Sequence, residues 1–186
     1  MFERFNEDAK AVVLRAQEVS RSLMHNFIGT EHVLIALLDE KESAACRVLN
    51  DRGVNRENVE ALVVRMVGKG EETITSTVPF TPRVKKSFEL ALRDSLSEGL
   101  RLITPEHLLL GMMKEHDGVA PRIVRDLGGG AEYYQIKEEI ERLFSAMPEL
   151  MLCTPDRVEQ QIDKQVKIRD MANAELRRLR RIKTRG

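Results

Sequence analysis

One stretch of the chain occurs twice, 75 residues apart, and this duplication constrains the fold more than any other feature. The first copy runs from Gly29 to Leu38 (GTEHVLIALL) and the second from Thr104 to Met113 (TPEHLLLGMM). Each copy has a polar start, then a Glu-His pair, then an apolar run at helical spacing. Flanking residues such as Phe5 and Phe80 match at the same offset. An internal repeat of this length predicts two copies of one folding unit.

Eight segments carry the signals of short helices, four in each copy of the repeat. Residues preferred at helix N-caps precede most of them, and proline follows two of these caps, where its missing N–H leaves no donor unpaired. Apolar residues then recur at helical spacing. The expected helices cover about residues 6–23, 30–40, 43–51 and 55–66, and in the second copy they begin at Thr81, Thr104, Val119 and Glu132.

The sequence therefore predicts an all-α fold, in which a duplicated four-helix unit gives eight short helices related by a pseudo-twofold axis. The repeats cover about residues 1–68 and 80–147, joined by a linker at 69–79 that is rich in Thr and contains Gly and Pro. A unit of roughly 65 residues buries little core alone, so we expect both repeats to form one domain over residues 1–147. Residues 148–186 are expected to form a connector and a basic C-terminal helix.

Charge and composition limit the class of protein. The formal net charge is zero, but residues 155–186 carry 10 Lys/Arg against 5 Asp/Glu, and residues 1–154 carry 20 against 25. The two cysteines, Cys46 and Cys153, suggest neither a disulfide framework nor a metal site. No apolar run approaches the ~20 residues that cross a bilayer, and the first residues lack the pattern of a signal peptide. We expect a cytoplasmic protein that does not contact a membrane.

The residues of an active site are not apparent. The four histidines, His25, His32, His107 and His116, follow no metal-binding spacing. His32 and His107 fall in the first turn of their helices, where we expect them to cap or pack the helix. The segment Gly68-Lys69-Gly70 lacks the spacing of a phosphate-binding loop. The sequence thus predicts a protein that is not an enzyme and that needs neither a metal nor another cofactor.

The paired glutamates Glu31 and Glu106 stand at equivalent points near a helix N-terminus, where free backbone N–H groups favour anions. Two interpretations are open. Each carboxylate could cap its own helix. Alternatively, it could receive a guanidinium through two parallel hydrogen bonds, while helix N–H groups and a basic side chain hold an attached phosphate.

Several motifs agree in order and spacing with one known family. The opening segment MFERF, the two Glu-His-x-Leu segments, the segment Phe80-Thr81-Pro82-Arg83 and the 75-residue duplication resemble the N-terminal domain of ClpC-type Clp unfoldases of the AAA+ class. The resemblance spans roughly residues 1–146. It implies a double four-helix fold and a role in receiving substrates and adaptors for a Clp protease.

The resemblance also implies a ligand. In ClpC-type domains, the equivalents of Glu31 and Glu106 grip arginine-phosphorylated residues, which mark proteins for degradation. The residues carried over to this binding are Glu106, Thr81 and Arg83 in the second unit, and Glu31 and Asn6 in the first. The family usually has Thr at the position of Asn6, and Asp8 would repel a phosphate. We therefore expect phosphoarginine to bind mainly through the second site.

Cyclic peptide antibiotics bind some ClpC-type domains between the two first helices. The resemblance places the matching positions at Phe2, Val13, Gln17, Phe80, Lys85, Glu89 and Leu92. Part of the surface of Val13 and Leu92 is expected to belong to the core. Phe2 and Phe80 fall outside the apolar stripes, and exposed aromatic side chains are good anchors for a ligand.

The family likeness ends before the ATPase modules of an unfoldase, so the sequence suggests a stand-alone Clp N-domain protein. Such a protein could deliver substrates to the protease, or it could compete with the unfoldase as a decoy. An alternative is a nucleic-acid-associated regulator, in which the basic residues 177–185 neutralise phosphates. A third interpretation is that the tail pairs with a Clp subunit or with a second copy of the chain.

Overall fold

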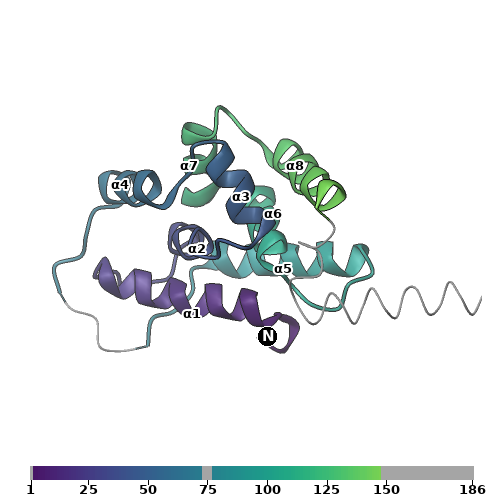
Figure 1. The fold of residues 1–186 in the computed structure, drawn as a ribbon. Helices are drawn as coiled ribbons and strands as arrows, with labels where there is room; N and C mark the ends of the chain where they lie inside the picture. Colours follow the sequence, from purple (N-terminus) through teal and green to yellow (C-terminus); the bar gives the residue numbers. More distant parts are fainter. Residues whose placement is uncertain (1, 73–76, 148–186) are drawn as a thin grey trace, which may run out of the picture.

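The computed structural model describes residues 2–72 and 77–147, and these residues are helical (Figure 1). The helices are η1 (Phe2–Arg4, a 3-10 turn), α1 (Glu7–Ser22), α2 (Thr30–Leu37), α3 (Ala44–Asp51), α4 (Arg56–Met66), α5 (Pro82–Ser97), α6 (Pro105–Glu115), α7 (Val119–Leu127) and α8 (Tyr133–Ala146). The predicted all-α fold with eight short helices is confirmed. The basic C-terminal helix and the residues behind the nucleic-acid alternative lie outside the described residues.

The helices begin where the sequence supplies a cap. The Asn6 side chain accepts a hydrogen bond from the backbone N–H of Ala9 at 2.9 Å, and the Thr81 hydroxyl accepts one from Val84 at 3.3 Å. Each such bond satisfies one of the N–H groups that the first turn leaves without a helical partner. These caps fix the starts of α1 and α5, the first helix of each repeat.

Two isolated β-bridges show the pseudo-twofold relation between the repeats. Phe5 bridges Ile103, and Ile28 bridges Phe80. Phe5 and Phe80 are separated by 75 positions, and so are Ile28 and Ile103. The two bridges are therefore the same contact made twice, with the roles of the repeats exchanged. This exchange ties the start of one repeat to the interior of the other.

The duplicated stretch forms the centre of the molecule. Every residue of α2 is buried, and α6 is buried from Pro105 to Met113. In Figure 1, α2 and α6 lie between α1 and α5 on one side and the remaining helices on the other. The starts of α2 and α6 are therefore buried as well, although their first turns carry polar side chains. Those starts carry Glu31 and Glu106.

Candidate functional site at the helix starts

Two backbone hydrogen bonds place the first helix of each repeat beside the second helix of the other. The N–H of Asn6 donates to the carbonyl of Ile103 at 3.0 Å, and the N–H of Thr81 donates to the carbonyl of Ile28 at 3.0 Å. Asn6 thus lies beside the start of α6, and Thr81 beside the start of α2. The residues expected to act together within each repeat are instead grouped crosswise.

We name the two groups after their buried glutamates. The Glu31 site consists of Thr30, Glu31, Thr81, Arg83, Glu115, Gly118 and Ala120. The Glu106 site consists of Asn6, Asp8, Glu40, Ser43, Ala44, Thr104 and Glu106. Each site joins the start of a first helix, the start of a second helix from the other repeat, and the start of a third helix.

The Glu106 carboxylate caps a helix of the other repeat. It is 5% exposed, and its Oε1 accepts a hydrogen bond from the backbone N–H of Ala44, at the start of α3, at 3.0 Å. The Thr104 hydroxyl donates to its Oε2 at 2.7 Å. Both carboxylate oxygens are therefore used inside the protein. Glu106 does not simply cap its own helix, because it also satisfies a donor 62 residues away.

The rim of the Glu106 site is acidic. Glu40 accepts a hydrogen bond from the Arg15 guanidinium at 3.0 Å. Burial raises the pKa of Glu40, the Arg15 charge lowers it, and the nearby Asp8 and Asp39 raise it further. At the start of α1, the Asn6 side chain is 1% exposed, and its Nδ2 has no hydrogen-bond partner among the described residues. The acidic side chains of this rim repel an anion, whereas Asn6 Nδ2 is a single neutral donor.

The start of α7 in the Glu31 site has no side-chain cap of its own, because its N-cap is Gly118. The hydroxyl of Thr30 supplies the missing acceptor, since the backbone N–H of Ala120 donates to it at 3.2 Å. Glu31 is 3% exposed. Burial raises the pKa of Glu31, while hydrogen bonds from its own backbone N–H and from Thr30 lower it. Glu31 thus caps its own helix and still carries a desolvated carboxyl group.

The rim of the Glu31 site carries a cation. The Arg83 guanidinium is 3.2 Å from Glu115 Oε1 and 3.7 Å from Asp117 Oδ2. The side chain of Arg83 is 51% exposed, whereas that of Glu115 is 8% exposed. The second oxygen of Glu115 has no hydrogen-bond partner among residues 2–72 and 77–147. An exposed guanidinium here can bind a phosphate as well as the protein's own carboxylate.

The capping role predicted for the two first-turn histidines is confirmed. The backbone N–H of Gly29 donates to Nδ1 of His32 at 2.8 Å, and that of Thr104 donates to Nδ1 of His107 at 3.2 Å. His32 and His107 therefore hold the starts of α2 and α6, which keeps the neighbouring glutamates in place.

His32 has a second contact that the sequence did not reveal. Its Nδ1 accepts a hydrogen bond from the backbone N–H of Gly29, so the ring proton is on Nε2, which lies 2.8 Å from Nδ1 of His25. His25 is then left to donate from Nε2 to the carbonyl of Gly68 at 3.1 Å. Burial, followed by the effect of His25, lowers the pKa of His32 to about 3. The hydrogen bonds of the two rings tie the α1–α2 loop to the end of the first repeat.

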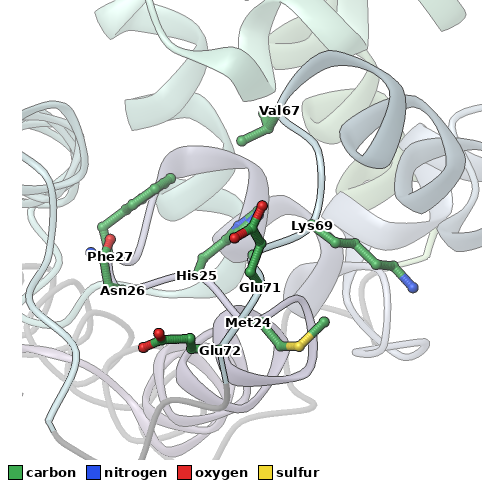
Figure 2. Close-up of a pocket in the computed structure, with 9 residues that line it drawn as sticks. Met24, His25, Asn26, Phe27, Val67, Lys69, Glu71 and Glu72 are labelled. Carbon is green, nitrogen blue, oxygen red and sulfur yellow. The ribbon is translucent and has the colours of Figure 1, made fainter.

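An open cleft of about 420 Å³ lies beside this histidine pair (Figure 2). The α1–α2 loop supplies His25 and Phe27, whose rings stack at 5.3 Å, and residues 67–72 line the opposite side. In the second repeat Leu100 takes the position of His25, and His107 instead contacts Glu98, with Nε2 and Oε2 3.3 Å apart. The two repeats therefore hold equivalent histidines by different chemistry.

The positions expected to bind cyclic peptides lie on α1, α5 and the segments before them. Val13 is 5% exposed, so most of its surface belongs to the core, as expected. Phe80 is half-buried and packs against the ring of Phe88, at 5.7 Å. The remaining positions are Gln17 and Leu92, which are half-buried, Lys85 and Glu89, which are exposed, and Phe2, whose side chain lies outside the described residues.

Within residues 2–72 and 77–147, no three His, Cys, Asp or Glu side chains are grouped so that they could hold a metal ion. In the same residues, no helix combines the length and the apolar character needed to cross a membrane.

Sequence reasoning missed Thr30 and Glu115. The sequence pattern predicts Thr30 only as the start of a helix. Its hydrogen bond with the backbone N–H of Ala120 depends on how the two repeats pack together. Glu115 does have a signal in the sequence, because Glu40 stands 75 positions before it. Glu115 is the last residue of α6, and Glu40 lies three residues after the end of α2, so this match within the duplication would have pointed to the pair.

Comparison with known proteins identifies a family. The chain matches the Clp repeat (R) N-terminal domain over residues 4–127 and again over residues 91–176. It is 40% identical over 143 residues to the chloroplastic ClpA homolog, an ATP-binding subunit of the ATP-dependent Clp protease, from Brassica napus, covering 77% of this chain and 16% of that protein. It is 39% identical over 149 residues to the chloroplastic chaperone protein ClpC2 of Oryza sativa subsp. japonica, covering 80% and 16%.

These relatives are much longer than the chain, which spans only 16% of their length. Both are named as chloroplastic proteins, so the likeness does not support the cytoplasmic location expected from the sequence.

Solved structures with the same fold are also Clp N-domains. The N-terminal domain of ClpD from Arabidopsis thaliana matches with a TM-score of 0.62 at 24% identity, covering 78% of this chain and 97% of that one. The N-domain of ClpV from Vibrio cholerae matches with a TM-score of 0.63 at 18% identity, covering 77% and 87%. A ClpV N-domain in complex with a VipB peptide matches with a TM-score of 0.60 at 19% identity, covering 77% and 89%. At these identities the likeness concerns the fold alone.

Proposed function

The chain belongs to the Clp repeat N-terminal domain family, and we propose that it is a non-catalytic binding module that presents arginine-phosphorylated proteins to a ClpC-type unfoldase. N-domains of this family bind the substrates and adaptors of Clp unfoldases. The finer proposal concerns the ligand, and it rests on the chemistry of the Glu31 site.

The observation that carries the proposal is that a buried carboxylate, Glu31, and an exposed guanidinium, Arg83, stand at two adjacent helix starts, those of α2 and α5. Phosphoarginine offers a guanidinium group and a phosphate a few ångströms apart. Glu31 is suited to accept hydrogen bonds from the guanidinium. Thr81, Arg83 and the start of α5 are suited to hold the phosphate, because free helix N–H groups and arginine both favour anions.

The Glu106 site lacks half of this chemistry. Asp8 stands where the other repeat has Arg83, and its charge contributes to the raised pKa of Glu40. A phosphate placed at the start of α1 would meet this acidic rim. We therefore propose one strong site, as the sequence suggested. Its glutamate is Glu31 rather than Glu106, because Thr81 and Arg83 lie beside the start of α2.

Calorimetric titration with phosphoarginine tests this proposal. The variants Glu31→Gln and Glu106→Gln keep the size of the side chain and remove one carboxylate each. We expect Glu31→Gln to weaken binding by about thirtyfold, because a charge-assisted hydrogen bond contributes about 2 kcal/mol. Glu106→Gln should leave affinity within about twofold. Equal losses from both variants, or a larger loss from Glu106→Gln, would rule out the assignment to the Glu31 site.

Adaptor proteins and cyclic peptide antibiotics are proposed to bind a second surface, formed by Phe2, Val13, Gln17, Phe80, Lys85, Glu89 and Leu92. The complex of a ClpV N-domain with a VipB peptide supports peptide binding by a fold of this kind. Phe80→Ala should weaken a cyclic peptide without changing phosphoarginine affinity, and binding of a fluorescent peptide measures the difference.

Delivery and competition remain the two ways in which such a module could act. They differ in one observable. Residues 1–186 added to a reconstituted ClpC-type protease should speed the degradation of an arginine-phosphorylated substrate if the chain is an adaptor, and slow it if the chain is a decoy. Arg83→Ala removes either effect, since both require the proposed Glu31 site.

A further inference from the structure

Arg83 has two possible partners in the Glu31 site, the Glu115 carboxylate and the phosphate of a ligand. In the unliganded protein its guanidinium is held by Glu115, with Nη1 and Oε1 3.2 Å apart. The proposed function requires the same guanidinium for the phosphate of a ligand. Within residues 2–72 and 77–147, Arg83 is the only basic side chain that forms an ion pair with Glu115.

The Glu115 carboxylate depends on this ion pair. Its side chain is 8% exposed, and its second oxygen has no hydrogen-bond partner among the described residues. That oxygen lies 3.0 Å from the position that a Cβ of Gly118 would occupy, so it faces the N-cap of α7. Leaving a buried carboxylate without its cation is strongly unfavourable. A ligand that draws Arg83 away must therefore overcome this penalty.

The Glu106 site shows how the conflict is avoided. Glu40, 75 positions before Glu115, is held by Arg15 at 3.0 Å. Arg15 lies two turns along α1, away from the first turn where a phosphate would sit. The Glu40 carboxylate is thus neutralised by a residue outside the first turn of α1, which also lies 3.8 Å from Asp39. In the Glu31 site, the position equivalent to Arg15 is Leu90, and the cation comes from the first turn instead.

We propose that Glu115 is an internal competitor that holds Arg83 in the unliganded protein and lowers the affinity of the Glu31 site for phosphorylated ligands. This inference rests on the proposed function. It adds a specificity element, because a ligand that offers only a guanidinium does not need Arg83, whereas a phosphorylated one must displace Glu115. Asp117, at 3.7 Å from Arg83, strengthens the same restraint.

A double-mutant cycle tests the competition. Phosphoarginine and inorganic phosphate are titrated separately into the wild type, Glu115→Gln, Arg83→Ala and the double variant. Glu115→Gln keeps the shape of the side chain and removes the charge, so we expect it to tighten both ligands by about tenfold. In the Arg83→Ala background the same substitution should have no effect, because the guanidinium for which Glu115 competes is gone.

Glu139→Gln is the matched control. Glu139 also binds an arginine, Arg52, at 2.7 Å, but this pair lies apart from the Glu31 site. Its loss should leave both affinities within about twofold of the wild type. If Glu115→Gln weakens binding, Glu115 positions Arg83 for the ligand. If it leaves binding unchanged, Glu115 has no influence on Arg83. Either result disproves the competition.

The two ligands separate this inference from the proposed function. If phosphoarginine fails to bind any variant, while Glu115→Gln tightens inorganic phosphate in an Arg83-dependent way, the proposed ligand is wrong and the competition holds. If phosphoarginine binds with equal affinity to the wild type and to Glu115→Gln, the proposed function holds and the competition is wrong.

Discussion

The Glu31 site and the Glu106 site descend from the same helix starts, yet they differ at the positions that meet a ligand. Both keep a buried glutamate and a capping histidine. The first-turn residue is Arg83 in one and Asp8 in the other, and the N-cap of the third helix is Gly118 in one and Ser43 in the other. The duplication thus retained the residues that hold the helix and changed the residues on the rim.

This difference teaches that the two repeats are specialised. Each site is completed by the other repeat, because Glu106 binds the start of α3 and Thr30 binds the start of α7. Neither repeat could therefore lose its contribution without exposing a helix end in its partner. This mutual capping restricts substitution of the interior residues, whereas the rim residues can differ in charge between the two repeats.

The largest expected effect is the dependence of stability on pH that His32 confers on the first repeat. The pKa of His32 is lowered from 6.5 to about 3 by burial and by His25. Between these values the unfolded chain binds a proton that the folded protein excludes, so the free energy of unfolding decreases as the pH falls through this range. The wild type should lose roughly 3 kcal/mol of its free energy of unfolding between pH 6.5 and pH 4, and the variant His32→Gln should not show this loss. Urea denaturation across this range measures it.

In the second repeat, Glu98 affects the free energy of unfolding in a different pH range. A hydrogen bond from His107 lowers the pKa of Glu98 below its usual 4.5, with burial acting in the opposite direction. Its contribution is complete above pH 4.5 and is lost only as the pH falls below it. The stability difference between Glu98→Gln and the wild type should therefore stay constant from pH 7 to pH 5. For the His32 prediction, parallel curves of unfolding free energy against pH for His32→Gln and the wild type would be the contradicting result. They would show that the folded protein binds a proton at His32.

The second effect concerns the two glutamates. Glu106→Gln should lower the free energy of unfolding by about 2 kcal/mol, because Ala44 N–H and the Thr104 hydroxyl donate to two different oxygens and an amide retains one acceptor. Glu31→Gln should instead raise it, by up to about 1 kcal/mol. Burial raises the pKa of Glu31, which means that its charged form opposes folding at pH 7. Thermal unfolding of the two variants measures the difference. Equal losses of stability in Glu106→Gln and Glu31→Gln would contradict the prediction.

How far the sequence predicts the molecule depends on the level considered. The 75-residue duplication and the N-caps identified every described α-helix, because caps and apolar periodicity are local properties of the chain. The expected second helix ended near residue 40, whereas α2 ends at Leu37. Of the residues that follow, only Leu38 is apolar and buried, whereas Asp39 and Glu40 are charged and half-buried, so the apolar pattern did not mark the true end of the helix.

The grouping of the site residues was beyond local reasoning. Thr81 and Glu106 belong to the same repeat and were expected to act together, whereas Thr81 bonds to Ile28 of the other repeat. Nothing in a segment's own pattern states which partner its start will meet. The pairing of His25 with His32 had no signal either, because the two residues are separated by a loop.

The third effect is a gain of function in the Glu106 site. Asp8→Arg places a guanidinium at the position equivalent to Arg83, where the wild type has a repulsive carboxylate. We expect phosphoarginine affinity at this site to rise by about tenfold, which corresponds to one added charge-assisted hydrogen bond. Calorimetry should then report two binding events instead of one. Asp8→Ala serves as the control, since it removes the repulsion alone and should give a smaller gain. A single event in a correctly folded Asp8→Arg variant would show that the two sites differ by more than their rims.

The smallest effect compares the caps of α3 and α7. The Ser43 hydroxyl accepts from the backbone N–H of Cys46 at 3.1 Å within its own helix, whereas Ala120 is served by Thr30 of the other repeat. Ser43→Ala and Thr30→Val should each lower stability by about 1 kcal/mol. Hydrogen exchange distinguishes them, because loss of a local cap frees only the start of α3, while loss of Thr30 frees the start of α7 and loosens its contact with α2. Unchanged exchange at Ala120 in Thr30→Val would mean that solvent satisfies this amide, and the mutual capping of the repeats would then rest on Glu106 alone.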